Sequence, residues 1–97
     1  MGVRHAREYS DILTELTEAV GEIEDCYLFF EMESGEWKAL DEEEKKEVLE
    51  ALADDVFYGL GEHSKIEVGS GIITYKPQHH IIEVMQGNQV SRIVRLI

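Results

Sequence analysis

The stretch KIEVGSGIITYKPQHHIIEVMQGNQVSRIVRLI, residues 65–97, decides the fold of this chain. Apolar and polar side chains alternate through most of it, and a period of two residues is typical of β-strands. The alternation breaks at Gly69-Ser70, Pro77-Gln78 and Gly87-Asn88. Two-residue breaks that begin with glycine are typical of tight hairpin turns, whereas proline suits the first turn position less well because its φ angle is negative. The stretch therefore predicts four short strands in an antiparallel meander.

Turns of two residues would also determine which residues lie side by side. In the resulting register four isoleucines form a row across the sheet: Ile66, Ile73, Ile82 and Ile93. The same register places Glu83 opposite Arg92 and Met85 opposite Val90. The face with the isoleucine row would also carry Val68, Tyr75, Val84 and Ile97. Because such an apolar face must be removed from water, we expect it to be the core face.

The last segment, residues 89–97, is also compatible with a helix. Its apolar residues recur at helical spacing: Val90, Ile93, Val94 and Ile97. Its many β-branched side chains and the preceding Gly87-Asn88 turn favour a strand. We expect a strand and keep the helix as the alternative.

Two other segments have apolar side chains at steps of three and four residues, the period of an amphipathic helix. The first covers residues 6–24, and the second lies between Asp41 and Gly61. Asp41 followed by Glu44 matches a capping box at a helix start. Two such helices can cover one face of the sheet. We therefore expect an α+β fold, a two-layer sandwich of two amphipathic helices on the four-stranded antiparallel meander.

Residues 27–40 are ambiguous between strand and helix. Apolar residues lie on both sides of Ser34-Gly35, which predicts an additional β-hairpin and the element order α-β-β-α-β-β-β-β. That hairpin would place Glu33 opposite Glu36, which is unfavourable because like charges repel across paired strands. The alternative extends the first helix through this region, whose apolar residues continue its stripe. We favour the hairpin.

Negative charge is concentrated in the helical part of the chain. Residues 1–61 carry 18 of the 21 carboxylates and 5 of the 9 Lys and Arg side chains, a net charge of −13. Residues 62–97 carry 3 carboxylates and 4 cations, a net charge of +1. The overall charge of −12 disfavours binding to nucleic acid or to an anionic membrane. An acidic inhibitor or nucleic-acid mimic that binds a basic protein is one alternative function.

Length and composition indicate one cytoplasmic domain. The 97 residues fall within the usual size of a single domain, so residues 1–97 are treated as one unit. No apolar run is long enough to span a membrane, and the first ten residues lack the apolar core of a secretory signal. Cys26 is the only cysteine, so no intrachain disulfide can form. Together these features predict the reducing cytoplasm.

A second apolar patch is predicted on the sheet face opposite the core. Its members are Ile81, Met85, Val90, Val94 and Leu96. Soluble monomers rarely expose a large apolar patch, and the final strand would be a sheet edge with few charges. Either the hairpin, with its Trp37, or a second copy of the chain would cover this patch. We therefore expect a non-enzymatic interaction or regulatory module that forms a homodimer through Trp37 and the patch.

Polar side chains at one end of the sheet form a candidate small-molecule site. In the predicted register the row consists of Ser64, Tyr75, His80 and Arg95. Tyr, His and Arg together can bind an anion or support proton transfer, which makes a ligand-binding or enzymatic site the second alternative. A polar row also commonly ends a sheet without such a role, and we favour that interpretation. No catalytic, metal or nucleotide motif accompanies it, so no catalytic residue, metal or cofactor is assigned.

Overall fold

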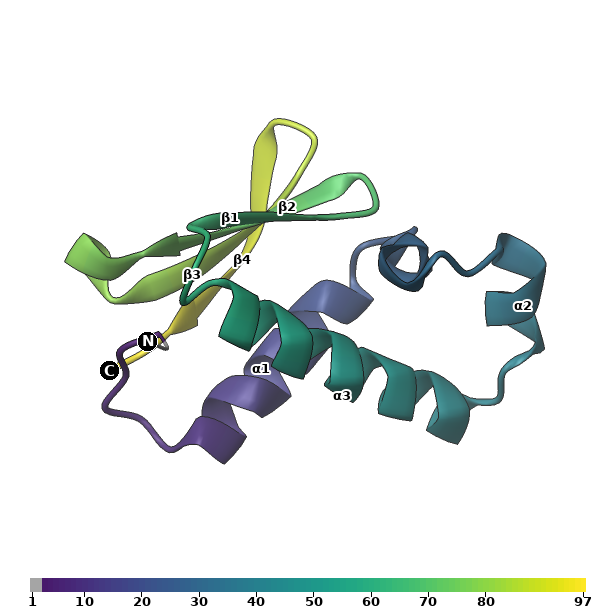
Figure 1. Cartoon of the computed structure of the whole chain (residues 1–97), viewed down its shortest axis with the longest axis horizontal. Coiled ribbons are helices and arrows are strands. Elements are labelled where there is room, and N and C mark those ends of the chain that lie inside the picture. Colours follow the sequence, from purple (N-terminus) through teal and green to yellow (C-terminus); the bar gives the residue numbers. More distant parts are fainter. Residues whose placement is uncertain (1–2) are drawn as a thin grey trace.

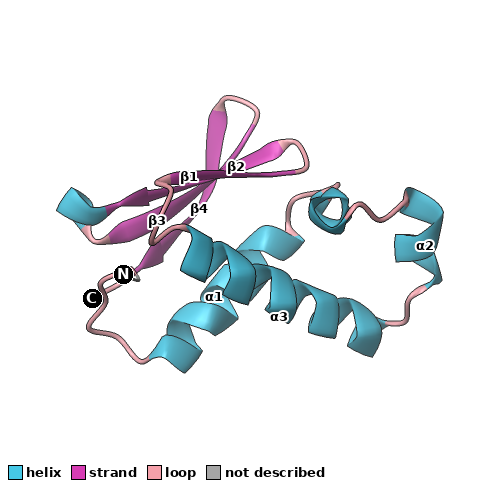
Figure 2. Cartoon of the chain, viewed as in Figure 1, coloured by secondary structure: helices cyan, strands magenta, loops and turns pink. Residues whose placement is uncertain are grey.

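The computed structural model describes residues 3–97. Its elements in chain order are α1 (Tyr9–Gly21), the 3₁₀ helix η1 (Cys26–Phe30), α2 (Ser34–Ala39), α3 (Glu42–Gly59), β1 (Lys65–Val68), β2 (Gly71–Lys76), the 3₁₀ helix η2 (Pro77–His79), β3 (Ile81–Gln86) and β4 (Gln89–Arg95). The four strands form one antiparallel sheet in the order β1-β2-β3-β4. Helices α1 and α3 lie on one side of this sheet (Figure 1, Figure 2), which confirms the predicted α+β class and its four-stranded meander.

The two long helices lie close to their predicted positions. At the start of α3 the N–H of Glu44 donates to Asp41 Oδ1 at 2.8 Å, and the N–H of Asp41 donates to Glu44 Oε1 at 3.0 Å. This capping box, as predicted, satisfies amide groups at a helix start. Helix α1 is shorter than the predicted range of residues 6–24. At its C-terminal end the N–H groups of Glu22 and Ile23 donate to the carbonyls three residues earlier, as in a 3₁₀ turn.

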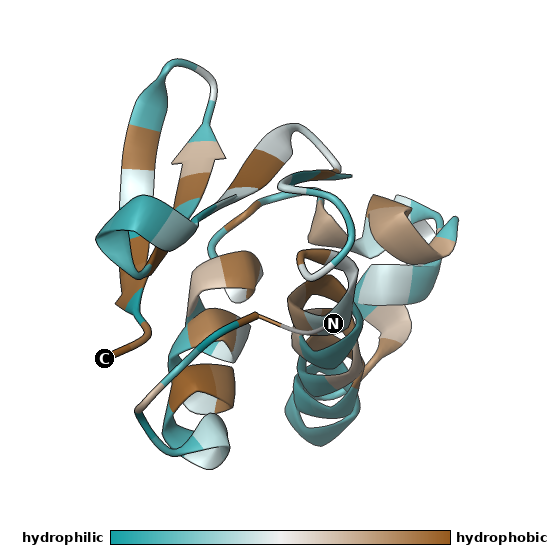
Figure 3. Cartoon of the chain, turned by 60° about the vertical axis from the view of Figure 1, so that its left-hand side comes forward, coloured by the Kyte–Doolittle hydropathy of each residue, from teal (hydrophilic) through white to brown (hydrophobic). Residues whose placement is uncertain are grey.

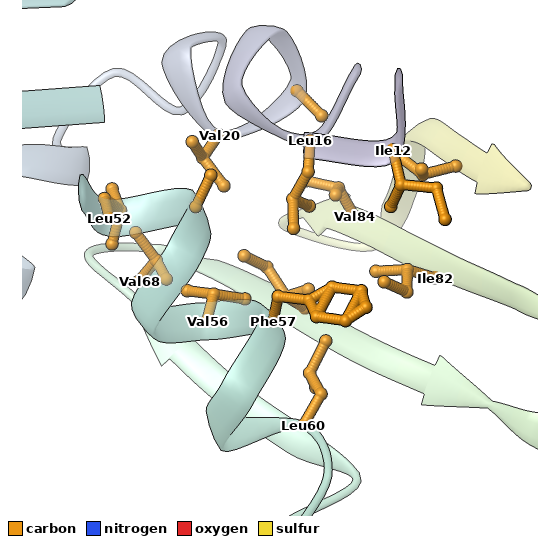
Figure 4. Packing of buried hydrophobic residues seen from close by; sticks show 14 of the residues in the cluster. Ile12, Leu16, Val20, Leu52, Val56, Phe57, Leu60, Val68, Ile82 and Val84 are labelled. Carbon is orange, nitrogen blue, oxygen red and sulfur yellow. The ribbon is translucent and has the colours of Figure 1, made fainter. Parts of the chain in front are cut away.

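One hydrophobic core fills the space between the helices and the sheet (Figure 4). Its fully buried side chains come from both layers: Ile12, Leu16 and Val20 of α1, Leu52 and Val56 of α3, and Val68, Ile73, Ile82, Val84 and Val94 of the sheet. Within residues 3–97, no buried side-chain nitrogen or oxygen lacks a hydrogen-bond partner. The interior is therefore apolar and internally satisfied, so the polar side chains of the described residues lie at the surface.

The predicted β-hairpin at residues 27–40 is wrong, and so is the alternative of a longer first helix. The chain instead forms η1 and then α2. At the start of α2 the N–H of Glu33 donates to Glu36 Oε1 at 3.1 Å. A carboxylate is stabilised by the unpaired amides of a helix start, whereas a hairpin would have placed these two carboxylates against each other. The two residues that would repel each other in a hairpin thus form the cap of α2.

The connection between β2 and β3 is longer than predicted. Pro77–His79 form a 3₁₀ turn, and His80 follows in the left-handed region at φ 53°. Proline cannot adopt the positive φ that a two-residue hairpin turn needs at its first position, so the positive φ falls on His80. Ile73 consequently pairs with Val84 and not with Ile82. A shift of two residues leaves every side chain on its predicted face.

A bulge in β4 changes the orientation of the last residues of the chain. Met85 pairs with Val90, as predicted, but Val84 pairs with Arg92, so Ser91 is an extra residue in β4. The hydroxyl of Ser91 donates to the carbonyl of Val84 at 3.2 Å. A shift of one residue moves every later side chain to the opposite face of the sheet.

Because of this bulge, part of the predicted core and part of the predicted surface exchange places. Val94 and Leu96 were expected on the outer face, but they are 1% and 0% exposed in the core. Ile93 and Ile97 were expected in the core, but they are 51% and 62% exposed. The four assignments are wrong for one reason, the extra residue in β4.

A hydrogen-bonded contact joins the segment after α1 to the turn between β1 and β2. Asp25 Oδ1 accepts from both the N–H and the hydroxyl of Ser70, each at 2.9 Å. Gly69, at φ 56°, lies so close that a Cβ there would collide with the carbonyl oxygen and the carboxylate of Asp25. The bonds from Ser70 hold the pKa of the Asp25 carboxyl below its usual value, because they favour the ionised form.

Replacing Asp25 by alanine is expected to lower the free energy of unfolding by about 1–3 kcal/mol at neutral pH, because two hydrogen bonds to a carboxylate are lost. Since folding lowers the pKa of Asp25, its contribution is present above the unfolded-state pKa and is lost as the pH falls through the folded-state pKa. Urea unfolding of both proteins from neutral to acidic pH measures this. A difference that stays constant into the acid range would contradict a role for the ionised form.

Candidate interaction surface

The outer face of the sheet is not covered by α1, α2 or α3 (Figure 3). Apolar side chains from three strands lie on it: Ile72 of β2, Ile81 and Met85 of β3, and Val90 and Ile93 of β4. We call these five residues the outer patch. Ile72, Val90 and Ile93 are 36%, 46% and 51% exposed. Ile72 pairs with Met85, which in turn pairs with Val90, so the patch contains a continuous row across three strands.

The charges on the outer face nearly cancel. They belong to Lys65, Glu67, Lys76, Glu83 and Arg95. Lys76 Nζ lies 3.2 Å from Glu83 Oε2. The helical part of the chain, by contrast, has a net charge of −13 over residues 1–61. Of the two layers, the sheet therefore presents the face that does not repel a second copy.

Strand β4 forms one edge of the sheet, and its end is partly covered. The N–H groups of Ala6 and Arg7 donate to the carbonyl of Leu96 at 2.8 and 3.1 Å. The Arg7 side chain also donates to the carbonyl of Arg95 at 3.0 Å and pairs with Glu15. An open edge strand is a template for strand pairing. The N-terminal segment therefore occupies one end of this edge, which favours the outer face over the edge as a contact surface.

Arg92 lies on the side of the sheet that faces α1. Its guanidinium is 3.1 Å from Glu18 Oε2 and 3.6 Å from Glu22 Oε2. The predicted pair of Arg92 with Glu83 is wrong, because the bulge turns Arg92 away from the outer face and Glu83 pairs with Ile93. Arg92 is therefore absent from the outer face, whereas Glu83 remains there, between Ile81 and Met85 along β3.

The predicted contact residues fall into three places. Those in the outer patch are Ile81, Met85 and Val90. Val94 and Leu96 are buried in the core and therefore cannot contact a partner. Trp37 belongs to α2, which lies away from the sheet (Figure 1), and its ring stacks on Tyr27 with centroids 5.9 Å apart.

Two members of the outer patch were missed by sequence reasoning. Ile72 precedes the core residue Ile73, and successive side chains of a strand point to opposite faces, so the sequence did indicate that Ile72 faces outward. Ile93 has no such signal. Its orientation depends on the extra residue Ser91, which is an ordinary strand residue in the sequence.

The predicted polar row is not assembled. Its members were Ser64, Tyr75, His80 and Arg95. Tyr75 pairs with Ile82 on the face that the helices cover, whereas Arg95 pairs with Ile81 on the outer face. Ser64 meets Tyr75 through its backbone, where the Ser64 carbonyl accepts the Tyr75 N–H at 2.8 Å. The geometry therefore does not bring Tyr75 and Arg95 together.

His80 instead borders an open hollow with Arg4 and His5, which sequence reasoning did not indicate. The hollow has a volume of about 460 Å³ and lies where the N-terminal segment meets the end of β4. The N–H of Arg4 donates to Tyr75 Oη at 3.2 Å, and His5 Nδ1 lies 2.9 Å from the carbonyl oxygen of Val3. The side chains of Arg4, His5 and His80 are exposed, so water competes for each of them and no reaction is assigned to this hollow.

The remaining reactive groups have structural surroundings. Burial raises the pKa of the Cys26 thiol, which disfavours the nucleophilic thiolate. Burial and a hydrogen bond to Asp54 raise the pKa of Tyr9. Among the described residues no three His, Cys, Asp or Glu side chains are grouped as metal ligands would be. None of the helices in that part of the chain is long and apolar enough to cross a membrane.

Comparison of the chain with protein-family models, with curated proteins and with solved structures finds no significant match.

Proposed function

We propose that this domain is a non-enzymatic interaction or regulatory module that forms a homodimer through the outer patch. The observation that carries the proposal is the apolar row of Ile72, Met85 and Val90, with Ile93 beside it, on an uncovered sheet face. Removing apolar surface from water stabilises an assembly by roughly 25 cal/mol per Å². Contiguous apolar patches on soluble domains commonly mark such contacts.

A second copy of the chain is the partner that the charges favour. Two copies that met through their helical layers would bring together two segments, residues 1–61, that each carry a net charge of −13. Two copies that met through their outer faces would bring charges that nearly cancel, and Lys76 is already paired with Glu83. Two sheets can pack face to face at about 10 Å with interleaved apolar side chains. The same patch on both copies then forms one self-complementary contact.

Sedimentation equilibrium at tens of micromolar tests this proposal. The expected mass is twice the 11.1 kDa of one chain. Replacing Ile93 by aspartate is expected to weaken the dimer at least tenfold, roughly 1.4 kcal/mol, because it places a carboxylate of each copy in the apolar contact.

Tyr58→Asp is the matched control. Tyr58 is 67% exposed on α3, so this variant adds the same charge to the helical layer and is expected to remain dimeric. A wild-type protein that stays at 11.1 kDa, or an Ile93→Asp variant that dimerises as tightly as the wild type, would remove the proposal.

A further inference from the structure

The segment between α1 and α3 combines exposed apolar side chains with dense negative charge. We call residues 24–44 the acidic arm. It carries nine carboxylates and one lysine, a net charge of −8. It contains η1, α2 and the start of α3, and α2 lies away from the sheet (Figure 1). Charge by itself only keeps such a segment solvated, so its apolar side chains decide what it can do.

Two apolar side chains of the acidic arm are partly exposed to solvent. Leu28 and Phe30 are 49% and 37% exposed. Within η1 only Cys26 is buried, and α2 contributes no buried residue. Glu31 follows at φ 58°, a conformation that residues other than glycine rarely adopt, and its N–H donates to the carbonyl of Leu28 at 3.0 Å. This turn ends η1 directly after Phe30.

The base of the acidic arm is fixed on α3. The rings of Tyr27 and Trp37 stack with an interplanar angle of 22°, so η1 and α2 contact each other. Lys45 Nζ of α3 lies 5.6 Å from the centroid of the Trp37 ring, a cation–π distance. Leu28 and Phe30 therefore belong to a helix, η1, whose position is held by contacts with α2 and, through Trp37, with α3. Such contacts reduce the entropy that is lost when a partner binds.

We infer that the acidic arm docks a basic segment of a partner protein whose apolar residues cover Leu28 and Phe30. The net charge of −8 attracts a cationic segment and repels nucleic acid, anionic lipid and a second copy of this chain, whose own charge is −12. The inference is separate from the proposed homodimer, because Leu28 and Phe30 belong to η1, which contacts the sheet at β1, whereas the outer patch lies on β2, β3 and β4.

Two synthetic peptides distinguish this site from simple charge attraction. One is an amphipathic peptide of lysine and leucine, and the other is an oligolysine with the same number of lysines. Trp37 is the only tryptophan of the chain and lies in the acidic arm, so its fluorescence reports binding to the full-length protein. We expect the lysine–leucine peptide to bind at least tenfold more tightly than oligolysine, and both affinities to fall with added salt.

The double variant Leu28→Ser with Phe30→Ser is expected to remove that tenfold advantage and to leave oligolysine binding unchanged. Tyr58→Ser is the matched control, because Tyr58 is exposed on α3 outside the acidic arm. Circular dichroism checks that each variant keeps the helical content of the wild type.

Amide chemical shifts of the wild-type protein supply a test that does not depend on a variant. Shifts caused by the lysine–leucine peptide are expected within residues 24–44. Equal binding of the two peptides, an unaffected double variant, or shifts centred on the outer patch would each overturn the inference. A weaker homodimer in the double variant would also overturn it, since the acidic arm would then contact a second copy.

Discussion

Replacing Val94 by aspartate is expected to unfold most of the protein, whereas the same replacement at the neighbouring Ile93 is expected to leave it folded. Val94 is 1% exposed among apolar side chains, where a carboxylate would have no partner. Burying an unpaired charge costs several kcal/mol, a large part of the roughly 5–15 kcal/mol that stabilises a small domain. At Ile93, which is 51% exposed, the carboxylate stays in water but lies opposite Glu83 of β3, and the cost is expected to be about 1–2 kcal/mol.

Far-UV circular dichroism and urea unfolding measure this contrast. Both variants should be compared at a protein concentration low enough to keep the wild type monomeric, because Ile93→Asp is also expected to disrupt the dimer. The two-residue register inferred from sequence predicts the reverse order, with Ile93 in the core. An Ile93→Asp variant that unfolds while Val94→Asp remains folded would show that β4 has no bulge at Ser91.

Replacing Gly69 by alanine is expected to be much more damaging than replacing Gly87 by alanine, although both glycines open two-residue turns at similar φ angles of 56° and 62°. Each alanine pays about 1–2 kcal/mol for the left-handed conformation. At Gly69 the new Cβ would also collide with Asp25, so the turn must move and the two hydrogen bonds from Ser70 are strained or lost. We expect a total loss of about 3 kcal/mol or more.

Gly87 is the control for this prediction. A Cβ at Gly87 would meet no atom within 4 Å, so its replacement should cost only the conformational term. Urea unfolding of the two variants measures the difference in free energy. Equal losses in the free energy of unfolding would mean that a Cβ at Gly69 does not collide with Asp25, and would contradict the prediction.

Much of the fold was predictable because local signals and tertiary contacts agree there. The capping box of Asp41 with Glu44 is a local signal, and α3 begins where it predicts. The turn at Gly69-Ser70 has two residues, and the pair of Ile66 with Ile73 follows from it. Alternation also predicted that one sheet face is buried under helices, as the core confirms.

Residues 27–40 were mispredicted because their apolar residues satisfy two periods at once over a short length. The helix that starts at Ser34 gains a bond from the Glu33 N–H to the Glu36 carboxylate, which a hairpin at Ser34-Gly35 would lack. The sequence did show that Glu33 and Glu36 would repel each other across a hairpin. Their role as a helix cap depends on where η1 ends and α2 begins.

The sequence by itself determined the composition of the two layers, since amphipathic period and turn residues are local properties that act within a few residues. It also determined the segregation of charge that leaves the sheet the less repulsive face. Only the tertiary structure decided which side chains of β4 form the outer patch. A single extra residue at Ser91 reverses every later side chain, and its position is selected by packing of Val94 and Leu96 against the helices and not by any local preference of the chain.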